Sequence, residues 1–123
     1  MTFTKIDSVA NEKYVYLRTI GRKTKNPHIV ELWFAVAEGK IYLSHEGPYT
    51  DWMKNILKDQ NVEFRIGKYK FTGKARIFPD GSAFETGKNA LYFKYYGNAS
   101  REVIDDWFSE STVIEIRVDN DRM

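Results

Sequence analysis

Three runs of extended sequence, separated only by short polar turns, constrain the fold more than any other feature of this chain. Residues 14–20 alternate between two faces, and runs at 28–37 and 40–44 follow the turns at 21–27 and 38–39. Turns this short join antiparallel neighbours, because a parallel pair needs a crossover of a dozen residues or more. The sequence therefore predicts an antiparallel meander at its start.

The rest of the sequence completes a small, mainly β chain. We expect a helix beginning at Thr50, strands at 62–66 and 69–78, a helix over 82–96, a short helix capped by Ser100 and a strand at 112–118. Six mostly antiparallel strands with few and short helices are typical of a small barrel, in which closure removes exposed strand edges. We therefore expect one α+β, mainly β domain over residues 1–123.

Apolar periodicity predicts which sides of these elements are buried. In the first strand, Val15, Leu17 and Thr19 share one face. The buried sides of the helices are expected to hold Trp52, Met53, Ile56 and Leu57 in the first, Leu91 and Tyr95 in the second, and Val103, Ile104, Trp107 and Phe108 in the third.

Residue types and motifs that are missing from the sequence exclude several classes of chemistry and of partner. The sequence has no cysteine and only two histidines, His28 and His45, so we expect no metal site. No Gly-x-Ser-x-Gly elbow or phosphate-loop glycine pattern is present, so an enzyme of this sequence would rely on a bound cofactor. Residues 1–13 lack a signal-peptide core, no apolar run approaches a membrane span, and the net charge is only +2. We expect a cytoplasmic protein without membrane or nucleic-acid contact.

A cluster of cations in the first turn is the main functional signal. Three cations fall within five positions, Gly21-Arg22-Lys23-Thr24-Lys25, and Thr19 precedes them. A glycine turn presents backbone N–H groups, and charge-assisted hydrogen bonds suit a phosphate or a carboxylate. The same composition also fits an ordinary solvated hairpin turn.

Two further segments have a functional and a structural interpretation. Ser44 and His45 lead into the helix that begins at Thr50, where a helix N-terminus attracts anions, but a plain capped connection is the alternative. Tyr92 and Tyr96 share a helical face at spacing i, i+4. They fit the wall of a pocket for a flat ring, or core or dimer packing.

Together these segments resemble the deazaflavin-dependent nitroreductase family, within the pyridoxamine 5'-phosphate oxidase-like split-barrel flavoproteins. The resemblance covers roughly residues 16–78, about half of the chain. It rests on the order and spacing of Thr19-x-Gly21-Arg22-Lys23-Thr24, Glu31-Leu32-Trp33-Phe34, Leu43-Ser44, Gly47, Trp52-x-x-Asn55-Ile56-Leu57, Val62-Glu63-Phe64 and Phe71-Thr72-Gly73-Lys74-Ala75-Arg76.

The resemblance implies a homodimeric, six-stranded split β-barrel that binds coenzyme F-420 or FMN. It implies hydride transfer between the cofactor and a small, electron-poor organic substrate, without a catalytic residue of the protein. The implied cofactor-binding residues are Thr19, Gly21, Arg22, Lys23, Thr24, Ser44, His45 and Trp52. Asn55 would brace the helix behind them. Tyr92 and Tyr96 lie beyond the part of the chain that the resemblance covers, and on the pocket-wall interpretation we expect them to line a substrate pocket.

Other interpretations of the same barrel stay open. One is a flavin-binding protein without turnover. A second is a barrel for single-stranded nucleic acid that uses cations such as Lys68, Lys70 and Lys74 beside aromatic residues, although the small net charge speaks against it. A third is a purely structural or partner-binding barrel.

Overall fold

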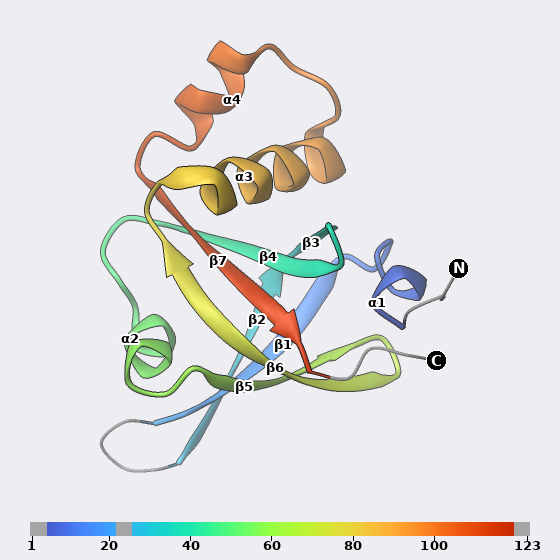
Figure 1. Cartoon of the computed structure of the whole chain (residues 1–123), viewed down its shortest axis with the longest axis vertical. Helices are drawn as coiled ribbons and strands as arrows, with labels where there is room; N and C mark the ends of the chain where they lie inside the picture. Colours follow the sequence, from blue (N-terminus) through green and yellow to red (C-terminus); the bar gives the residue numbers. More distant parts are fainter. Residues whose placement is uncertain (1–4, 22–25, 120–123) are drawn as a thin grey trace.

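The strands form one curved sheet. In the computed structural model, the described part of the chain, residues 5–21 and 26–119, holds seven strands in the order β2-β1-β5-β6-β7-β4-β3 (Figure 1). All neighbouring strands are antiparallel. The strands are β1 (Tyr14–Ile20), β2 (Pro27–Trp33), β3 (Ala35–Ala37), β4 (Lys40–Glu46), β5 (Asn61–Ile66), β6 (Tyr69–Phe78) and β7 (Ser111–Val118). The helices are α1 (Lys5–Ser8), α2 (Asp51–Lys58), α3 (Gly81–Tyr96) and α4 (Arg101–Trp107).

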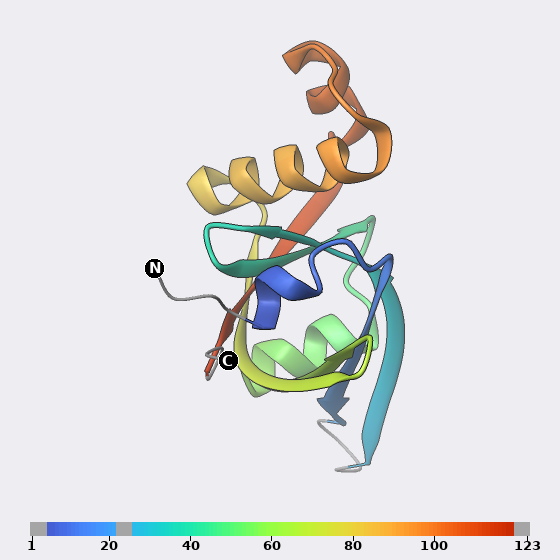
Figure 2. The same ribbon diagram turned by 90° about the vertical axis from the view of Figure 1, so that its right-hand side faces the viewer.

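The two edges of the sheet are consecutive in the chain, and this makes the sheet curl. β2 pairs with β1 at one edge and β3 pairs with β4 at the other, and only Phe34 separates β2 from β3. The sheet therefore wraps round into a split barrel (Figure 2). The prediction of six strands was wrong, because residues 28–37 divide at Phe34 where the chain leaves one partner for the other.

Side chains from α3 replace the ladder that is interrupted at Phe34. The Phe34 N–H donates to the Tyr95 hydroxyl oxygen at 3.0 Å. The Tyr95 hydroxyl lies 2.8 Å from the Phe34 carbonyl and 2.7 Å from that of Lys13, so it donates to one of them at a time. The Lys94 ammonium donates to the carbonyls of Glu12 (2.6 Å) and Phe34 (2.9 Å). These two side chains tie the strand break to the N-terminal segment.

Apolar residues are buried on both sides of the sheet. The larger core fills the barrel and includes Val15, Leu17, Phe64 and Ile114, with Trp52, Met53 and Ile56 of α2 packed into it. A smaller core lies between the outer face of the sheet and α3, and includes Tyr42, Leu91, Phe108 and Val113. The predicted inward face of the first strand is confirmed: Val15, Leu17 and Thr19 are all buried.

Two helices differ from the predicted burial. In α2, Leu57 is 63% exposed and Asn55 is buried instead. In α4, which lies beside α3 (Figure 1), Val103 and Trp107 are exposed, whereas Ile104 and the following Phe108 pack into the smaller core. The buried Lys88 of α3 holds α4 through its ion pair with Asp105 and also pairs with Glu85 at 2.7 Å.

None of the helices in the described ranges is long and apolar enough to cross a membrane.

Candidate functional site

A buried hydrogen bond fixes the end of β1 to helix α2. The Asn55 side-chain amide donates to the Thr19 hydroxyl oxygen at 3.1 Å, and both residues are at least 98% buried. Two residues further on, the Gly21 N–H donates to the Asn26 carbonyl at 2.7 Å and closes the base of the hairpin turn. The cation-rich turn therefore leaves the sheet from a point that is anchored to α2.

The connection between β4 and α2 lies at the N-terminus of the same helix, about one turn before Asn55. His45 meets the buried Trp52 edge to face, with ring centroids 6.5 Å apart, and its Nε2 lies 3.0 Å from the Pro48 carbonyl oxygen. Thr50 occupies the N-cap position of α2, but its side chain does not cap the helix. Its hydroxyl oxygen is buried without a hydrogen-bond partner among residues 5–21 and 26–119. The beginning of α2 thus offers a polar atom that an added oxygen acceptor would satisfy.

Three of the residues implied as cofactor-binding, Thr19, His45 and Trp52, belong to α2 or contact it, and Gly21 and Ser44 lie close to them in sequence. Thr19 and Gly21 lie at the end of β1, His45 contacts Trp52, and Ser44 is the preceding residue of β4, half-buried and opposite Val113 of β7. Three others, Arg22, Lys23 and Thr24, lie outside the residues that the structure describes.

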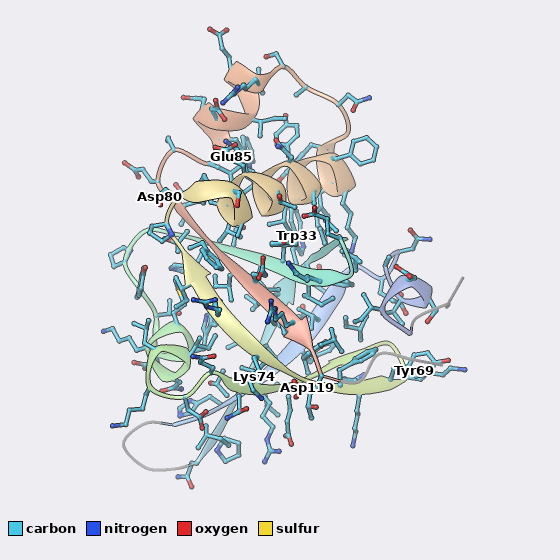
Figure 3. All side chains as sticks on the ribbon, viewed as in Figure 1. Trp33, Tyr69, Lys74, Asp80, Glu85 and Asp119 are labelled. Carbon is cyan, nitrogen blue, oxygen red and sulfur yellow. The ribbon has the colours of Figure 1, made fainter. Side chains whose placement is uncertain are left out.

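Tyr92 and Tyr96 belong to a second group of aromatic side chains, which come from α3 itself, from the end of β2 and from α4. Their ring centroids are 5.1 Å apart, and Trp107 of α4 meets both of them edge-on, 6.3 Å from Tyr92 and 5.0 Å from Tyr96. Trp33 at the end of β2 stacks on Tyr95 at 4.2 Å and lies beneath α3 (Figure 3). We call Trp33, Tyr92, Tyr95, Tyr96 and Trp107 the aromatic group.

The aromatic group meets the β1–β2 hairpin at the end away from the turn. Trp33 pairs with Tyr14, whereas Thr19 pairs with His28. The five residue steps from Tyr14 to Thr19 span about 17 Å of extended strand. The structure therefore does not bring Trp33 to the residues around α2. Sequence analysis missed Trp33 and Trp107 as site candidates, because Trp107 was assigned to the buried side of its helix and Trp33 counted only as part of a strand motif. Only the long-range contacts with α3 show their place.

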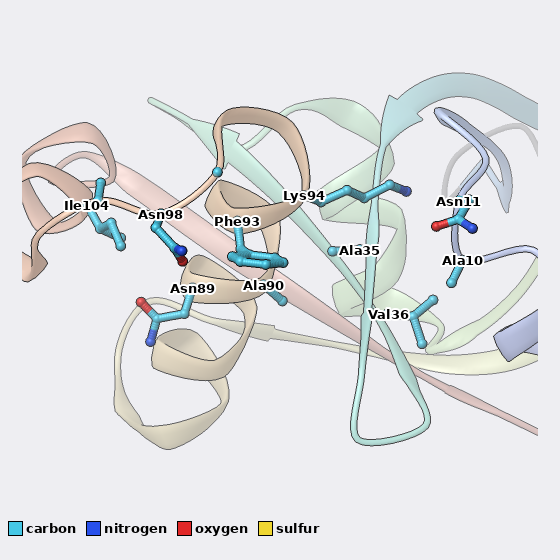
Figure 4. A pocket seen from close by; sticks show the side chains of 12 residues that line it. Ala10, Asn11, Ala35, Val36, Asn89, Ala90, Phe93, Lys94, Asn98 and Ile104 are labelled. Carbon is cyan, nitrogen blue, oxygen red and sulfur yellow. The ribbon is translucent and has the colours of Figure 1, made fainter.

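An open cleft of about 740 Å³ lies between α3, β3 and the segment after α1 (Figure 4), and no residue of the aromatic group is among those that line it. Three asparagine side chains line it, from Asn11, Asn89 and Asn98, together with Phe93 and Lys94. Burial lowers the pKa of Lys94 to about 8, against an opposing contribution from the Glu12 carboxylate. The ammonium group already donates to two carbonyls and lies 3.6 Å from the centre of the Phe34 ring. Lys94 is therefore a structural tie at the edge of the cleft.

The described residues contain no group of three histidine, aspartate or glutamate side chains that could hold a metal ion.

Solved structures of other proteins share this fold. The conserved hypothetical protein Rv2991 from Mycobacterium tuberculosis superposes with a TM-score of 0.78 at 23% identity, over 96% of this chain and 81% of that one. A putative pyridoxamine 5'-phosphate oxidase from Listeria innocua gives 0.68 at 16% identity, over 96% and 94%. A protein described as F420 Reductase gives 0.66 at 20% identity, over 93% of both chains. At these identities the likeness establishes the fold.

Sequence comparison identifies the family. No curated protein matches the chain. The sequence profile of the F420H(2)-dependent quinone reductase family, however, matches residues 5–103. That range includes the β1–β2 turn, all of α2 and all of α3, and it confirms the resemblance to deazaflavin-dependent enzymes. The chain belongs to the F420H(2)-dependent quinone reductase family.

Proposed function

We propose that this protein is an oxidoreductase that uses reduced coenzyme F-420 to reduce a small, electron-poor acceptor of the quinone type. The observation that carries the proposal is the family match over residues 5–103. The chemistry of the sequence agrees with it, because a chain without cysteine and with two histidines depends on a cofactor for redox chemistry. FMN is the alternative cofactor.

The residues around α2 fit an anionic cofactor. The Thr50 hydroxyl is buried without a partner among the described residues, at the N-terminus of α2, where the helix dipole favours negative charge. The turn that starts at Gly21 adds the cations Arg22, Lys23 and Lys25 in sequence. An anionic group held between the turn and α2 would accept a hydrogen bond from the Thr50 hydroxyl and would pair with the cations of the turn.

Each part of the site then has a proposed role. Arg22, Lys23 and Thr24 hold the phosphate or the acidic tail, with Gly21 shaping the turn. Ser44, His45 and Trp52 form the wall toward the ring system, and Tyr92 and Tyr96 line the substrate pocket. When bound, the reduced deazaflavin supplies the hydride, and the side chains bind and orient the reactants.

Titration of the purified protein with coenzyme F-420 and with FMN, followed by cofactor fluorescence, tests the proposal. We expect F-420 to bind at micromolar protein and the bound, reduced cofactor to be oxidised when a soluble quinone is added. Protein that binds neither cofactor contradicts the proposal. Binding without oxidation leaves a cofactor-binding protein that does not turn over quinones.

A double variant tests the cation-rich turn. Arg22→Ala with Lys23→Ala removes two charge-assisted contacts, so we expect the dissociation constant to rise by roughly 10- to 100-fold. The matched control is Lys70→Ala with Arg117→Ala, which removes the same charges from exposed positions on β6 and β7. Equal affinities of the two double variants would move the anion site away from the turn.

We also propose that the protein works as a homodimer. β2 is an edge strand, so its outer N–H and C=O groups face away from the sheet. It carries two exposed apolar side chains, Ile29 (66% exposed) and Trp33 (40% exposed). An edge of this kind is suited to contact with a second copy.

A further inference from the structure

We propose that the cleft between α3, β3 and the segment after α1 is a second ligand site, which takes an uncharged molecule of the nucleoside type. Its volume of about 740 Å³ lies in the range typical of small-molecule sites. The cleft is separate from the residues around α2. Val36, which lines it, pairs with Ile41 of β4, and His45 lies four residue steps further along that strand, about 13 Å away. A ligand in the cleft would therefore leave the proposed cofactor site free.

β3 presents an unpaired piece of backbone to this cleft. Glu38 and Gly39 both have positive φ angles, 53° and 74°, as in a two-residue type I′ turn. In such a turn the flanking residues, Ala37 and Lys40, bond to each other. Bonded and unbonded positions alternate along an antiparallel pair, so the N–H and C=O of Val36 point away from β4. No residue within 5–21 and 26–119 bonds to either group.

In the described part of the chain, this edge of β3 is open at one residue only. Two positions earlier, the N–H and C=O of Phe34 are already bonded to side chains of α3, and two positions later the chain enters the turn. An added β-strand bonds at every second residue, so a peptide strand would find a single bonding position here. A cyclic amide has an N–H next to a C=O and matches one such position with two hydrogen bonds. The edge therefore suits a planar base such as hypoxanthine better than a peptide.

Other side chains of the cleft suit the sugar and the ring of such a ligand (Figure 4). The side-chain amides of Asn11, Asn89 and Asn98 have no hydrogen-bond partner among the described residues. Each amide can donate and accept, which matches the hydroxyl groups of a ribose. The Phe93 ring is 63% exposed, lies one helical turn after Asn89 and offers a face on which a base can stack.

The charges of the cleft favour a neutral ligand. None of the described residues that line it is acidic, so nothing there would pair with a cation. Lys94 is the one cation among them, and its ammonium already donates to the carbonyls of Glu12 and Phe34. Burial also lowers its pKa to about 8, which weakens it further as a partner for an anion. A phosphate would gain little here, so a nucleoside fits better than a nucleotide.

Titration of the isotope-labelled full chain with inosine, followed by amide chemical shifts, tests this inference. We expect the Val36 N–H and the side-chain amides of the three asparagines to shift, with a dissociation constant below about 1 mM. Inosine methylated on its ring N–H keeps the charge and loses the donor, so we expect it to bind about tenfold more weakly or less. Inosine monophosphate should bind no more tightly than inosine.

Two variants at one position separate the backbone group from the side chain. Val36→Pro removes the N–H without breaking a bond to β4, at an edge position of the kind that accepts proline. We expect it to weaken inosine binding about tenfold, whereas Val36→Ala, which keeps the N–H, should stay within about threefold of wild type. If Val36→Pro does not fold, inosine against its methylated form on the wild-type protein decides in the same way.

The inference is overturned if inosine does not bind, if the shifts lie outside the cleft, or if inosine and its methylated form bind equally well. Tighter binding of the monophosphate would overturn it too, because the cleft would then recognise an anion. Competition between inosine and coenzyme F-420 would mean one shared site and would also contradict it. Failure of F-420 to bind overturns the proposed function alone and leaves the inosine result standing.

Discussion

At the scale of single residues, the Tyr95 hydroxyl of α3 is notable because it has hydrogen-bond contacts with three backbone groups. It accepts from the Phe34 N–H and donates toward the carbonyls of Phe34 and Lys13. In Tyr95→Phe the Phe34 N–H and the Lys13 carbonyl lose this partner, while the Phe34 carbonyl keeps the Lys94 ammonium and the ring keeps its stack on Trp33. We expect a loss of about 1–3 kcal/mol in the free energy of unfolding, measured by urea denaturation.

Tyr96→Phe is the matched control, because Tyr96 follows directly on the same helix and is 48% exposed. Its hydroxyl makes no hydrogen bond that the structure shows within residues 5–21 and 26–119. We expect its stability to stay within about 0.5 kcal/mol of wild type. Equal losses in the two variants would mean that the strand break does not depend on Tyr95.

The protonation of Lys94 makes the free energy of unfolding depend on pH. Burial lowers its pKa in the folded protein to about 8, below the ordinary value of 10.5. Between these values the folded protein has released the proton that the unfolded chain still binds, so stability rises with pH. Burial raises the pKa of Tyr42 and Tyr95, so both oppose the rise only above about pH 10, where unfolded tyrosine ionises.

The urea midpoint measured at pH 7.5 and at pH 9.5 tests this dependence. We expect the wild-type midpoint to increase over this range relative to that of Lys94→Met, which lacks the titrating group. Parallel midpoints in the two proteins would show that Lys94 does not titrate in this window.

At the scale of elements, the contact of α3 with the sheet depends on Gly87. A Cβ atom at this position would lie 2.6 Å from Val113 Cγ1 and 2.7 Å from Tyr42 Cδ1. Alanine favours helix by about 1 kcal/mol over glycine, but the overlap forces α3 away from β4 and β7. We expect Gly87→Ala to lower the free energy of unfolding by about 1–3 kcal/mol.

Asn89→Ala on the exposed side of α3 is the control for helix propensity, and we expect it to be neutral or slightly stabilising. A stabilised Gly87→Ala protein in the same thermal or urea measurement would show that α3 approaches the sheet less closely than described.

Local pattern predicted the elements well and their partners poorly. The alternation of residues 14–20 was enough to assign the inward face of β1. The break at Phe34 leaves no such mark, because the apolar run through Leu32, Trp33 and Ala35 suits a continuous strand equally well. The sequence also does not show that α2 buries Asn55 and exposes Leu57, since Asn55 bonds to Thr19, which lies 36 residues away in the chain.

At the scale of the whole molecule, the proposed dimer makes its own prediction. Ile29→Lys places a charge on the outer edge of β2, and burying an unpaired charge in an interface is costly. We expect sedimentation to show a shift from dimer to monomer. Leu57→Lys is the control, since Leu57 is similarly exposed but belongs to α2. A wild-type monomer, or dissociation by both variants alike, contradicts an interface at β2.

The tie between Phe34 and α3 also sets an order of events during synthesis. The Phe34 amide finds its partner 61 residues later in the chain, at Tyr95. A ribosome that has made β1 to β4 has therefore produced both edges of the sheet but not the side chains that join them. The nascent barrel stays open until α3 and then β7, the strand between β6 and β4, have emerged, and the newborn protein is most exposed to proteases and to misplaced strand pairing during that interval.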